Sequence, residues 1–390
     1  MKLAVVTSHP IQYQAPLFRE LAKRCDLTVF FAHRQSAQQQ AEAGYGVAFE
    51  WDSDLLLGYN HVFLQNISPK PDVTKFGGCD APEIADHVRR GKFNALLLTG
   101  WHLKVYWQAA LACRRHGVPM MVRGDSQLGT PRGVVKRVAK RFLYPLLLRQ
   151  FSAALYVGQR NREYLAHYHM PSDRMYFSPH CVDINAYSTN VSSTQRQAMR
   201  DEWGVGINGF VALFVGRMMP FKRPEDMVLA IKLLRDRGMD VTGVFAGAGV
   251  LRATLEALGK THGVPLVFLG FCNQSALPMV YAAADALVLP SSGEETWGLV
   301  VNEALVCGTP CAVSDACGCA PDMIVRGETG DVFPVGNVAA LADAIMQCLR
   351  IQRNTSALQL QSDRYSVKAA SAGVMLALKN IGTAASDAHY

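Results

Sequence analysis

Apolar and polar positions follow one another along this chain in two alternating patterns. Short uninterrupted apolar runs are typical of strands buried on both faces of a parallel sheet. Longer segments with an apolar residue every three or four positions are typical of amphipathic helices. In the first half, the runs predict strands at residues 3–7, 27–32, 95–99, 119–123 and 153–157 and the spaced segments predict helices at residues 15–24, 105–116 and 161–169.

The same alternation starts again after a polar, turn-rich stretch at residues 188–208, within which residues 194–203 have helical spacing. Strands are predicted at residues 211–215, 241–246, 267–269, 286–289 and 311–314, and helices at residues 223–237, 252–262, 276–284, 298–307, 338–350 and 365–380. Strand and helix in alternation predict an α/β protein of two Rossmann-like domains. We place these domains at residues 1–188 and 189–367, and expect a C-terminal helix at about 368–390 to pack back on the first domain.

Composition and charge indicate the cellular compartment of these two domains and the kind of partner they bind. The chain has 390 residues, of which 49% are apolar, so that two hydrophobic cores can form. No apolar run approaches the roughly 20 residues that span a bilayer, the first residues lack the pattern of a secretory signal, and ten scattered cysteines favour reduced thiols. We therefore expect a cytoplasmic protein. Residues 1–188 carry a net charge of +9 and the remainder −2, which favours an anionic partner for the first half.

Charged residues and glycines gather where strands of the second domain are predicted to end. Gly216-Arg217 follows one strand, with Lys222 close behind, and these two cations suit a diphosphate. Gly247 opens a tight turn after the next strand. The helix predicted from residue 298 presents the N–H groups of Gly298, Leu299 and Val300 toward the same edge, where helix N-termini favour phosphate.

Two glutamates bracket the start of this helix. Glu303 lies one turn inside it, where a carboxylate can accept two hydrogen bonds from the vicinal diol of a ribose. Glu295 lies in the preceding turn, placed for the hydroxyls of a second sugar beyond the phosphates. Any one of these charged residues alone would be typical of a solvated surface. Their grouping favours a nucleotide-sugar site instead.

The order Gly216-Arg217-x4-Lys222, Gly247-x-Gly249, Glu295-x7-Glu303 and Cys307-Gly308-Thr309-Pro310 resembles the nucleotide half of the family 4 retaining glycosyltransferases of GT-B fold. The resemblance covers about 100 residues. It implies two domains facing each other across a cleft, transfer with retention, and no metal or other cofactor. It also implies that Arg217 and Lys222 hold the donor diphosphate, Glu303 the ribose, and Glu295 the donor sugar. The loop Cys317-Gly318-Cys319 departs from the family pattern of Gly-Gly-x-Pro-Glu.

The first half resembles the acceptor domain of that family more loosely. The segment at residues 8–17, which lacks the glycine-rich loop of many members, is closer to a subgroup associated with bacterial surface polysaccharide assembly. The family's active-site histidine has no counterpart, because that position holds Arg123 or Gly124. We therefore take His102, which follows the neighbouring strand, as the substitute. The residues expected to contact the acceptor are His9, Gln12, Tyr13, Arg123 and Asp125.

Residues 132–149 form a basic amphipathic segment, typical either of docking on anionic lipid headgroups or of an ordinary helix with a solvated cationic face. No aromatic platform accompanies the cations, so nucleic acid is not expected. Asp52-Ser53-Asp54 looks like the metal-binding motif of the other main glycosyltransferase fold, but we interpret it as a solvated turn. The cysteines at 307–319 lack zinc-ligand spacing.

The predicted function is a hexosyltransferase that uses a nucleotide-sugar donor and a glycan or lipid-linked acceptor. A sugar-nucleotide epimerase of the same fold and a non-catalytic nucleotide-sugar binding protein remain as alternatives.

Overall fold

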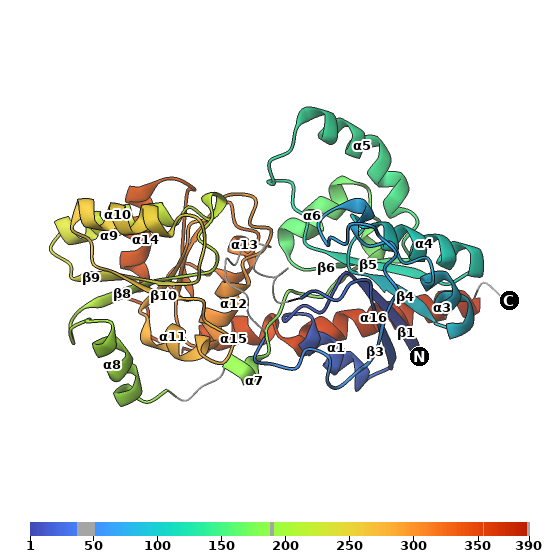
Figure 1. Cartoon of the computed structure of the whole chain (residues 1–390), viewed down its shortest axis with the longest axis horizontal. Coiled ribbons are helices and arrows are strands. Elements are labelled where there is room, and N and C mark those ends of the chain that lie inside the picture. Colours follow the sequence, from blue (N-terminus) through green and yellow to red (C-terminus); the bar gives the residue numbers. More distant parts are fainter. Residues whose placement is uncertain (37–50, 188–190, 354, 388–390) are drawn as a thin grey trace.

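The computed structural model describes residues 1–36, 51–187, 191–353 and 355–387, which form two α/β domains side by side (Figure 1). Residues 188–190, at the expected domain boundary, and the end of the last predicted helix at 388–390 lie outside the described residues. The fold confirms the expected pair of Rossmann-like domains facing each other across a cleft.

The first domain is built on a seven-stranded sheet whose strand order is β3-β2-β1-β4-β5-β6-β7. Every pairing in it is parallel, for example Val5 beside Val29 and Leu97. Central strands bury side chains on both faces, which explains their uninterrupted apolar sequence. The strands are β1 (Lys2–Thr7), β2 (Asp26–Phe31), β3 (Asn60–Phe63), β4 (Ala95–Leu98), β5 (Met120–Gly124), β6 (Ala153–Tyr156) and β7 (Met175–Phe177).

Helices cover both faces of this sheet. One face packs against α3 (Ile84–Gly91), α4 (Lys104–His116) and α6 (Gln159–His167), and the other against α1 (Ala15–Ala22). Two short 3-10 turns, η2 (Phe76–Gly78) and η3 (Ser172–Arg174), lie in the connections. In contrast, α5 (Val134–Leu148) stands away from the domain (Figure 1), and Leu148 is its buried residue.

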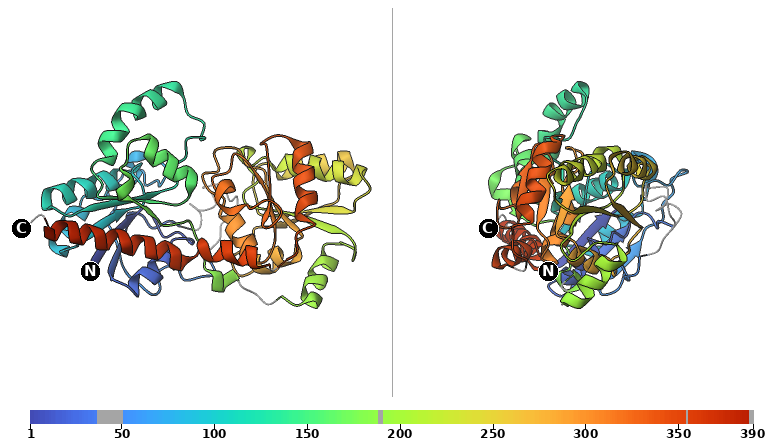
Figure 2. Two further views of the ribbon diagram at one scale, coloured as in Figure 1. Left: turned by 180° about the vertical axis from the view of Figure 1, so that it is seen from behind. Right: turned by 90° about the vertical axis from the view of Figure 1, so that its left-hand side faces the viewer.

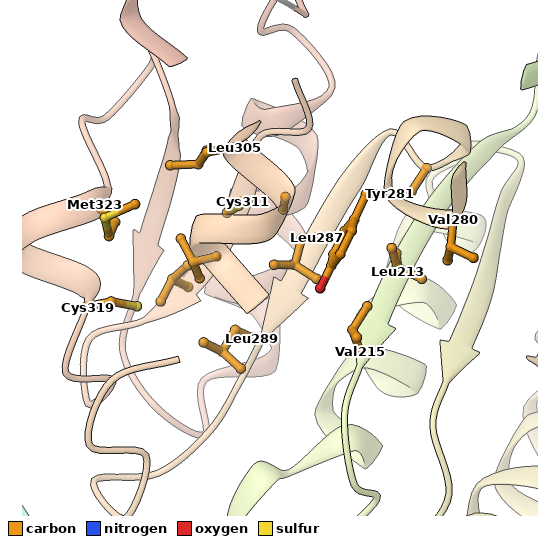
Figure 3. Close-up of a cluster of buried hydrophobic side chains, with 14 of the residues drawn as sticks. Leu213, Val215, Val280, Tyr281, Leu287, Leu289, Leu305, Cys311, Cys319 and Met323 are labelled. Carbon is orange, nitrogen blue, oxygen red and sulfur yellow. The ribbon is translucent and has the colours of Figure 1, made fainter. Parts of the chain in front are cut away.

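The second domain repeats the plan with a six-stranded parallel sheet in the order β10-β9-β8-β11-β12-β13. Its strands are β8 (Phe210–Val215), β9 (Val241–Ala246), β10 (Leu266–Gly270), β11 (Ala286–Leu289), β12 (Cys311–Ser314) and β13 (Gly330–Phe333). Its helical elements are α8 (Ser193–Glu202), η4 (Pro220–Lys222), α9 (Pro224–Asp236), α10 (Arg252–His262), α11 (Leu277–Ala283), α12 (Leu299–Val306), α13 (Ala320–Met323), α14 (Val338–Cys348) and α15 (Ser356–Arg364). Figure 3 shows one core layer, in which the ring of Tyr281 stands beside Leu287 of β11 and Leu213 of β8.

The chain crosses between the domains twice. It first passes through α7 (Ile184–Tyr187), and it returns after α15 into α16 (Val367–Asp387), which runs along the first domain (Figure 2). The two crossings touch through a parallel bridge between Val182 and Ser366. Ala370 and Val374 of α16 are fully buried, and this helix packs against α1, β6 and β7, so α16 completes the core of the first domain.

Candidate active site

The carboxyl ends of β8, β9 and β11 and the N-terminus of α12 surround a cavity of about 400 Å³ between the domains, which we call the donor cavity. This is the edge at which open α/β sheets bind ligands. The predicted site residues that line it are Gly216, Arg217, Lys222, Gly247, Glu295, Gly298, Leu299, Val300 and Glu303, joined from the first domain by Gln12, Tyr13 and Asp125.

Glycines let the backbone come close to the space that a ligand would fill. Gly247 has φ +145°, and a Cβ there would lie 2.1 Å from the carbonyl oxygen of Gly216, so the two turns after β8 and β9 can touch only without a side chain. Gly298, with φ +106°, turns the chain sharply into α12. The first turn of α12 therefore faces the donor cavity, where its N–H groups can bind an anion.

Lys222 and Glu295 form an ion pair at the centre of the cavity wall. The Lys222 Nζ lies 2.5 Å from Glu295 Oε2, and the two side chains are only 12% and 16% exposed. Ser291 donates a second hydrogen bond to the same carboxylate oxygen at 3.3 Å. Because η4 carries Lys222 and the turn before α12 carries Glu295, this pair ties together the two segments expected to hold a diphosphate.

Glu303 lies deeper in the same cavity and is 7% exposed. Tyr281 donates a hydrogen bond of 2.6 Å to its Oε2 atom. Burial raises the pKa of Glu303 to about 7, although the hydrogen bond from Tyr281 favours the carboxylate. The carboxylate is thus held rigidly with one oxygen occupied and has capacity left for hydroxyl donors.

The unusual loop at Cys317-Gly318-Cys319 supports the Glu295 turn from behind. The Gly318 N–H donates to the Glu295 carbonyl and the Cys319 N–H to the Trp297 carbonyl, both at 3.0 Å. A Cβ on Gly318 would lie 1.7 Å from the Thr296 carbonyl oxygen, so only glycine fits. Both cysteines are fully buried thiols. The loop therefore fixes the backbone of the turn even though its sequence departs from the family pattern.

Sequence reasoning missed a histidine that belongs to this region. His180, shortly after β7, lies with its Nε2 atom 3.7 Å from Asp125 Oδ2, and both residues line the donor cavity. Burial lowers the pKa of His180, which the neighbouring Asp125 carboxylate offsets only in part. Thr296 donates to Asp125 at 2.8 Å, so Asp125 is held between the domains. The signal was the polar Ser178-Pro179-His180 sequence, which follows a strand too short to be recognised.

A second and larger cavity, of about 920 Å³, opens beside the donor cavity in the first domain, and we call it the acceptor cavity. It lies between the carboxyl ends of the first sheet and α5, and Tyr13 and Asp125 line both cavities. His102 lines the acceptor cavity, where its Nε2 atom lies 3.2 Å from the Val73 carbonyl oxygen. The structure therefore does not bring His102 to the donor cavity beside Glu295.

Two other predicted acceptor contacts line neither cavity. Arg123 is buried, and its guanidinium donates to the carbonyl oxygens of Ser178, at 3.3 Å, and Pro179, at 2.7 Å. It thereby holds the segment that positions His180. His9 is partly buried beside Ser8, whose Oγ lies 2.9 Å from His9 Nδ1, and burial lowers the pKa of His9 to about 4. These contacts place both residues behind the site.

The segment Trp51–Asp54 crosses toward the second domain. Asp52 accepts a hydrogen bond from the backbone N–H of Ser275, and Ser53 donates to the Gln274 side chain, both at 2.9 Å. Trp51 and Ser53 also line the donor cavity. The interpretation of Asp52-Ser53-Asp54 as a solvated turn is therefore incomplete, since this turn links the two domains. In the described ranges no three His, Cys, Asp or Glu side chains gather as a metal site would require.

The geometry thus provides a diphosphate-binding wall, a buried carboxylate for a diol and an adjoining open cavity. Together with two facing Rossmann-like domains, these features define the GT-B fold. Residues 195–364, which make up most of the second domain, match the family model described as Glycosyl transferases group 1.

Curated relatives have similar sequences. D-inositol 3-phosphate glycosyltransferase of Corynebacterium glutamicum is 30% identical over 262 residues, which cover 64% of this chain and 60% of the relative. GDP-mannose-dependent alpha-(1-6)-phosphatidylinositol monomannoside mannosyltransferase of Mycolicibacterium smegmatis is 28% identical over 301 residues, covering 71% and 74%. The match thus spans less than two thirds of the length of the first of these relatives.

Solved structures share the whole architecture. Anabaena HepE in complex with UDP superposes with a TM-score of 0.74 at 19% identity, covering 97% of this chain and 100% of that one. A Listeria monocytogenes protein described as a putative UDP-N-acetylglucosamine 2-epimerase superposes with a TM-score of 0.61 at 14% identity, covering 97% and 95%. At these identities the likeness shows a common fold.

Proposed function

We propose that the protein is a hexosyltransferase that moves a sugar from a nucleotide-diphosphate donor to a glycan or lipid-linked acceptor. The observation that carries this proposal is the pair of adjoining cavities. The donor cavity gathers Lys222, Glu295 and Glu303 at the start of one helix, and Tyr13 and Asp125 stand where it meets the acceptor cavity. A transferase needs this arrangement, because its two substrates must meet in one place.

Departure of the nucleoside diphosphate is the step that the donor cavity would assist. Breaking the anomeric C–O bond leaves negative charge on the leaving phosphate oxygen. Arg217, Lys222 and the N–H groups of Leu299 and Val300 line the space where that charge would develop. Fixed donors of this kind stabilise such a charge without reorganising. We propose that they do so without a metal ion and that no other cofactor takes part.

The two glutamates of the donor cavity have separate roles in this proposal. Glu303 accepts hydrogen bonds from the ribose diol, and Glu295, held by Lys222, accepts them from hydroxyls of the donor sugar. Retention of anomeric configuration follows from the family resemblance, with the acceptor hydroxyl attacking on the face that the diphosphate leaves. His180 and Asp125 stand beside this face, so they join the list of groups that can orient the acceptor.

The comparisons support the substrate classes in this proposal. The relatives are named for inositol-phosphate and phosphatidylinositol-mannoside acceptors, and structures of Anabaena HepE contain UDP or UDP-glucose. We place the enzyme in cell-surface polysaccharide or glycoconjugate synthesis on the cytoplasmic side, with residues 132–149 resting on an anionic membrane surface. No helix in the described ranges has the length and hydropathy needed to cross a bilayer.

A screen of sugar nucleotides by thermal shift, followed by incubation with the best binder, tests the proposal. We expect transfer of the sugar to a lipid-linked or oligosaccharide acceptor, with release of nucleoside diphosphate. Formation of an isomeric sugar nucleotide without an acceptor would indicate an epimerase instead. Binding of donor without transfer to any acceptor would indicate a binding protein.

A further inference from the structure

The acceptor cavity has an unusual distribution of charge. Arg132 and Lys140 of the α5 region and Arg114 of α4 line it, while Asp125, at its junction with the donor cavity, is the only acidic residue among the described residues that line it. Among the ion pairs of the described residues, none involves Arg132 or Lys140. Clustered cations without carboxylates favour an anionic ligand.

Lys140 is the most constrained of these cations. Its Nζ atom lies 3.2 Å from the Tyr164 hydroxyl and 4.5 Å from the centre of the Tyr144 ring. Burial, together with the nearby charges of Arg132 and Lys136, lowers the pKa of Lys140 to about 8. Because this ammonium group is partly buried among other cations, binding an anion stabilises it more than it would stabilise a fully solvated lysine.

The mouth of the acceptor cavity is apolar. Leu143 and Leu146 of α5 are 62% and 59% exposed, and Trp107 of α4 is 47% exposed; all three line the cavity. Leu111 extends this rim, and a narrow apolar pocket of about 140 Å³ continues from it beneath Trp107 and Leu147. On the same helix Val135 and Phe142 are 82% and 69% exposed. Large exposed apolar side chains that ring a cationic cavity mark a surface that contacts lipid.

From this order of groups, we infer that the acceptor is a saccharide linked through phosphate to a lipid, with the phosphate bound by Lys140 and Arg132. The sugar end lies toward Tyr13 and Asp125, where the donor cavity begins. The lipid leaves past Leu143, Leu146 and Trp107 into the membrane on which α5 rests. This inference rests on the proposed transferase function and specifies its acceptor.

The test uses the full-length protein with its donor cavity filled by a saturating nucleoside diphosphate, because that cavity can itself bind a diphosphate. The three probes are farnesyl diphosphate, inorganic diphosphate and farnesol. Titration calorimetry measures each affinity below the concentration at which the lipids form micelles. We expect farnesyl diphosphate to bind tightest, because only it carries both the anion and the chain. Equal affinity for inorganic diphosphate would refute the lipid contact, and equal affinity for farnesol would refute the anion site.

Paired variants locate the binding. Lys140→Gln should weaken binding of farnesyl diphosphate roughly ten- to a hundredfold, the loss expected for one charge-assisted hydrogen bond. Arg141→Gln removes an exposed cation of the same helix that neither lines the cavity nor acts on Lys140, so it should leave binding within about twofold. Leu143→Gln should weaken farnesyl diphosphate and spare inorganic diphosphate, with Ile207→Gln, at an 82% exposed side chain of the second domain, as its control. Equal effects of Arg141→Gln and Lys140→Gln would overturn the site.

Sugar-nucleotide thermal shifts on the same proteins, without added nucleoside diphosphate, keep the two hypotheses distinct. The variants of α5 should retain the wild-type shift, which also shows that they are folded. Retained sugar-nucleotide binding and transfer to a soluble oligosaccharide, without farnesyl diphosphate binding, would refute the lipid-phosphate acceptor alone. Absence of any sugar-nucleotide shift in the wild-type protein would refute the proposed function first.

Discussion

Glu303→Gln removes a buried charge and keeps nearly the same shape, so it isolates the electrostatic cost of this carboxylate. The pKa of Glu303 rises from an ordinary 4.5 to about 7 because the group is buried. A carboxyl with a raised pKa binds protons more tightly in the folded state than in the unfolded chain. The free energy of unfolding of the wild type should therefore fall as pH rises from about 4.5 through 7.

The linkage relation sets the size of this effect. Relative to the fully protonated group, the penalty is ~1 kcal/mol at pH 5, ~2 kcal/mol at pH 6 and ~3 kcal/mol above pH 7, where it levels off. The variant lacks this component, because a glutamine does not titrate. Its stability relative to the wild type should thus increase by ~2 kcal/mol between pH 5 and pH 8.

Urea unfolding of both proteins across this pH range measures the difference directly. Other titrating groups, including the buried histidines, are common to both chains and cancel in the comparison. Glu294→Gln, at an exposed carboxylate of the neighbouring turn, is the matched control and should show no such trend. A wild-type-to-variant difference that stays flat from pH 5 to pH 8 would refute the reasoning about Glu303.

Four further predictions follow from the site and its supports. Lys222→Gln should lower kcat by roughly a hundredfold while changing nucleotide affinity less, because a fixed cation stabilises the departing diphosphate more than the bound donor; equal losses in both would contradict that role. Prolonged treatment with EDTA should leave transfer unchanged, and restoration of activity by added Mg²⁺ or Mn²⁺ would show a metal requirement instead. Gln127→Ala removes hydrogen bonds of 3.0 and 3.1 Å to the carbonyls of residues 293 and 295, so the Tm should fall and kcat should drop about tenfold; an unchanged kcat would show that the Glu295 turn holds itself. Phe142→Glu should reduce sedimentation with phosphatidylglycerol vesicles without lowering the Tm, since this side chain is exposed, and undiminished sedimentation would count against docking through α5.

The central strands could be predicted from the sequence because buried parallel strands leave a continuous apolar run. The edge strands β3, β7 and β13 were missed. Each is only three or four residues long, and a strand with one neighbour is less enclosed, so its sequence does not form a long apolar run. The boundaries of the predicted helices agree with the structure to within a few residues, and α16 (Val367–Asp387) begins near the start of the C-terminal helix expected at about 368–390. No helix was predicted for α3 or α15.

The donor cavity was predictable for a similar reason. Its residues lie at the carboxyl ends of recognised strands or at one helix start, where short-range sequence fixes their position. The contribution of the first domain to the site was not predictable. His180 lines the donor cavity but follows an unrecognised strand, and only the burial of its side chain shows that Arg123 supports the site from behind. Trp51–Asp54 reaches the second domain through a contact more than 200 positions away, which no local pattern encodes.

The return of α16 to the first domain makes that domain discontinuous in the sequence. Its core combines apolar side chains from the first half of the chain, such as Leu17 and Phe18, with Ala370 and Val374 of α16. A chimera that exchanges acceptor halves at a single junction near residue 190 would pair a new first domain with a foreign last helix, leaving two apolar surfaces that do not fit. Exchange of acceptor specificity between such proteins therefore requires two junctions, and the natural places are the crossings that meet at Val182 and Ser366.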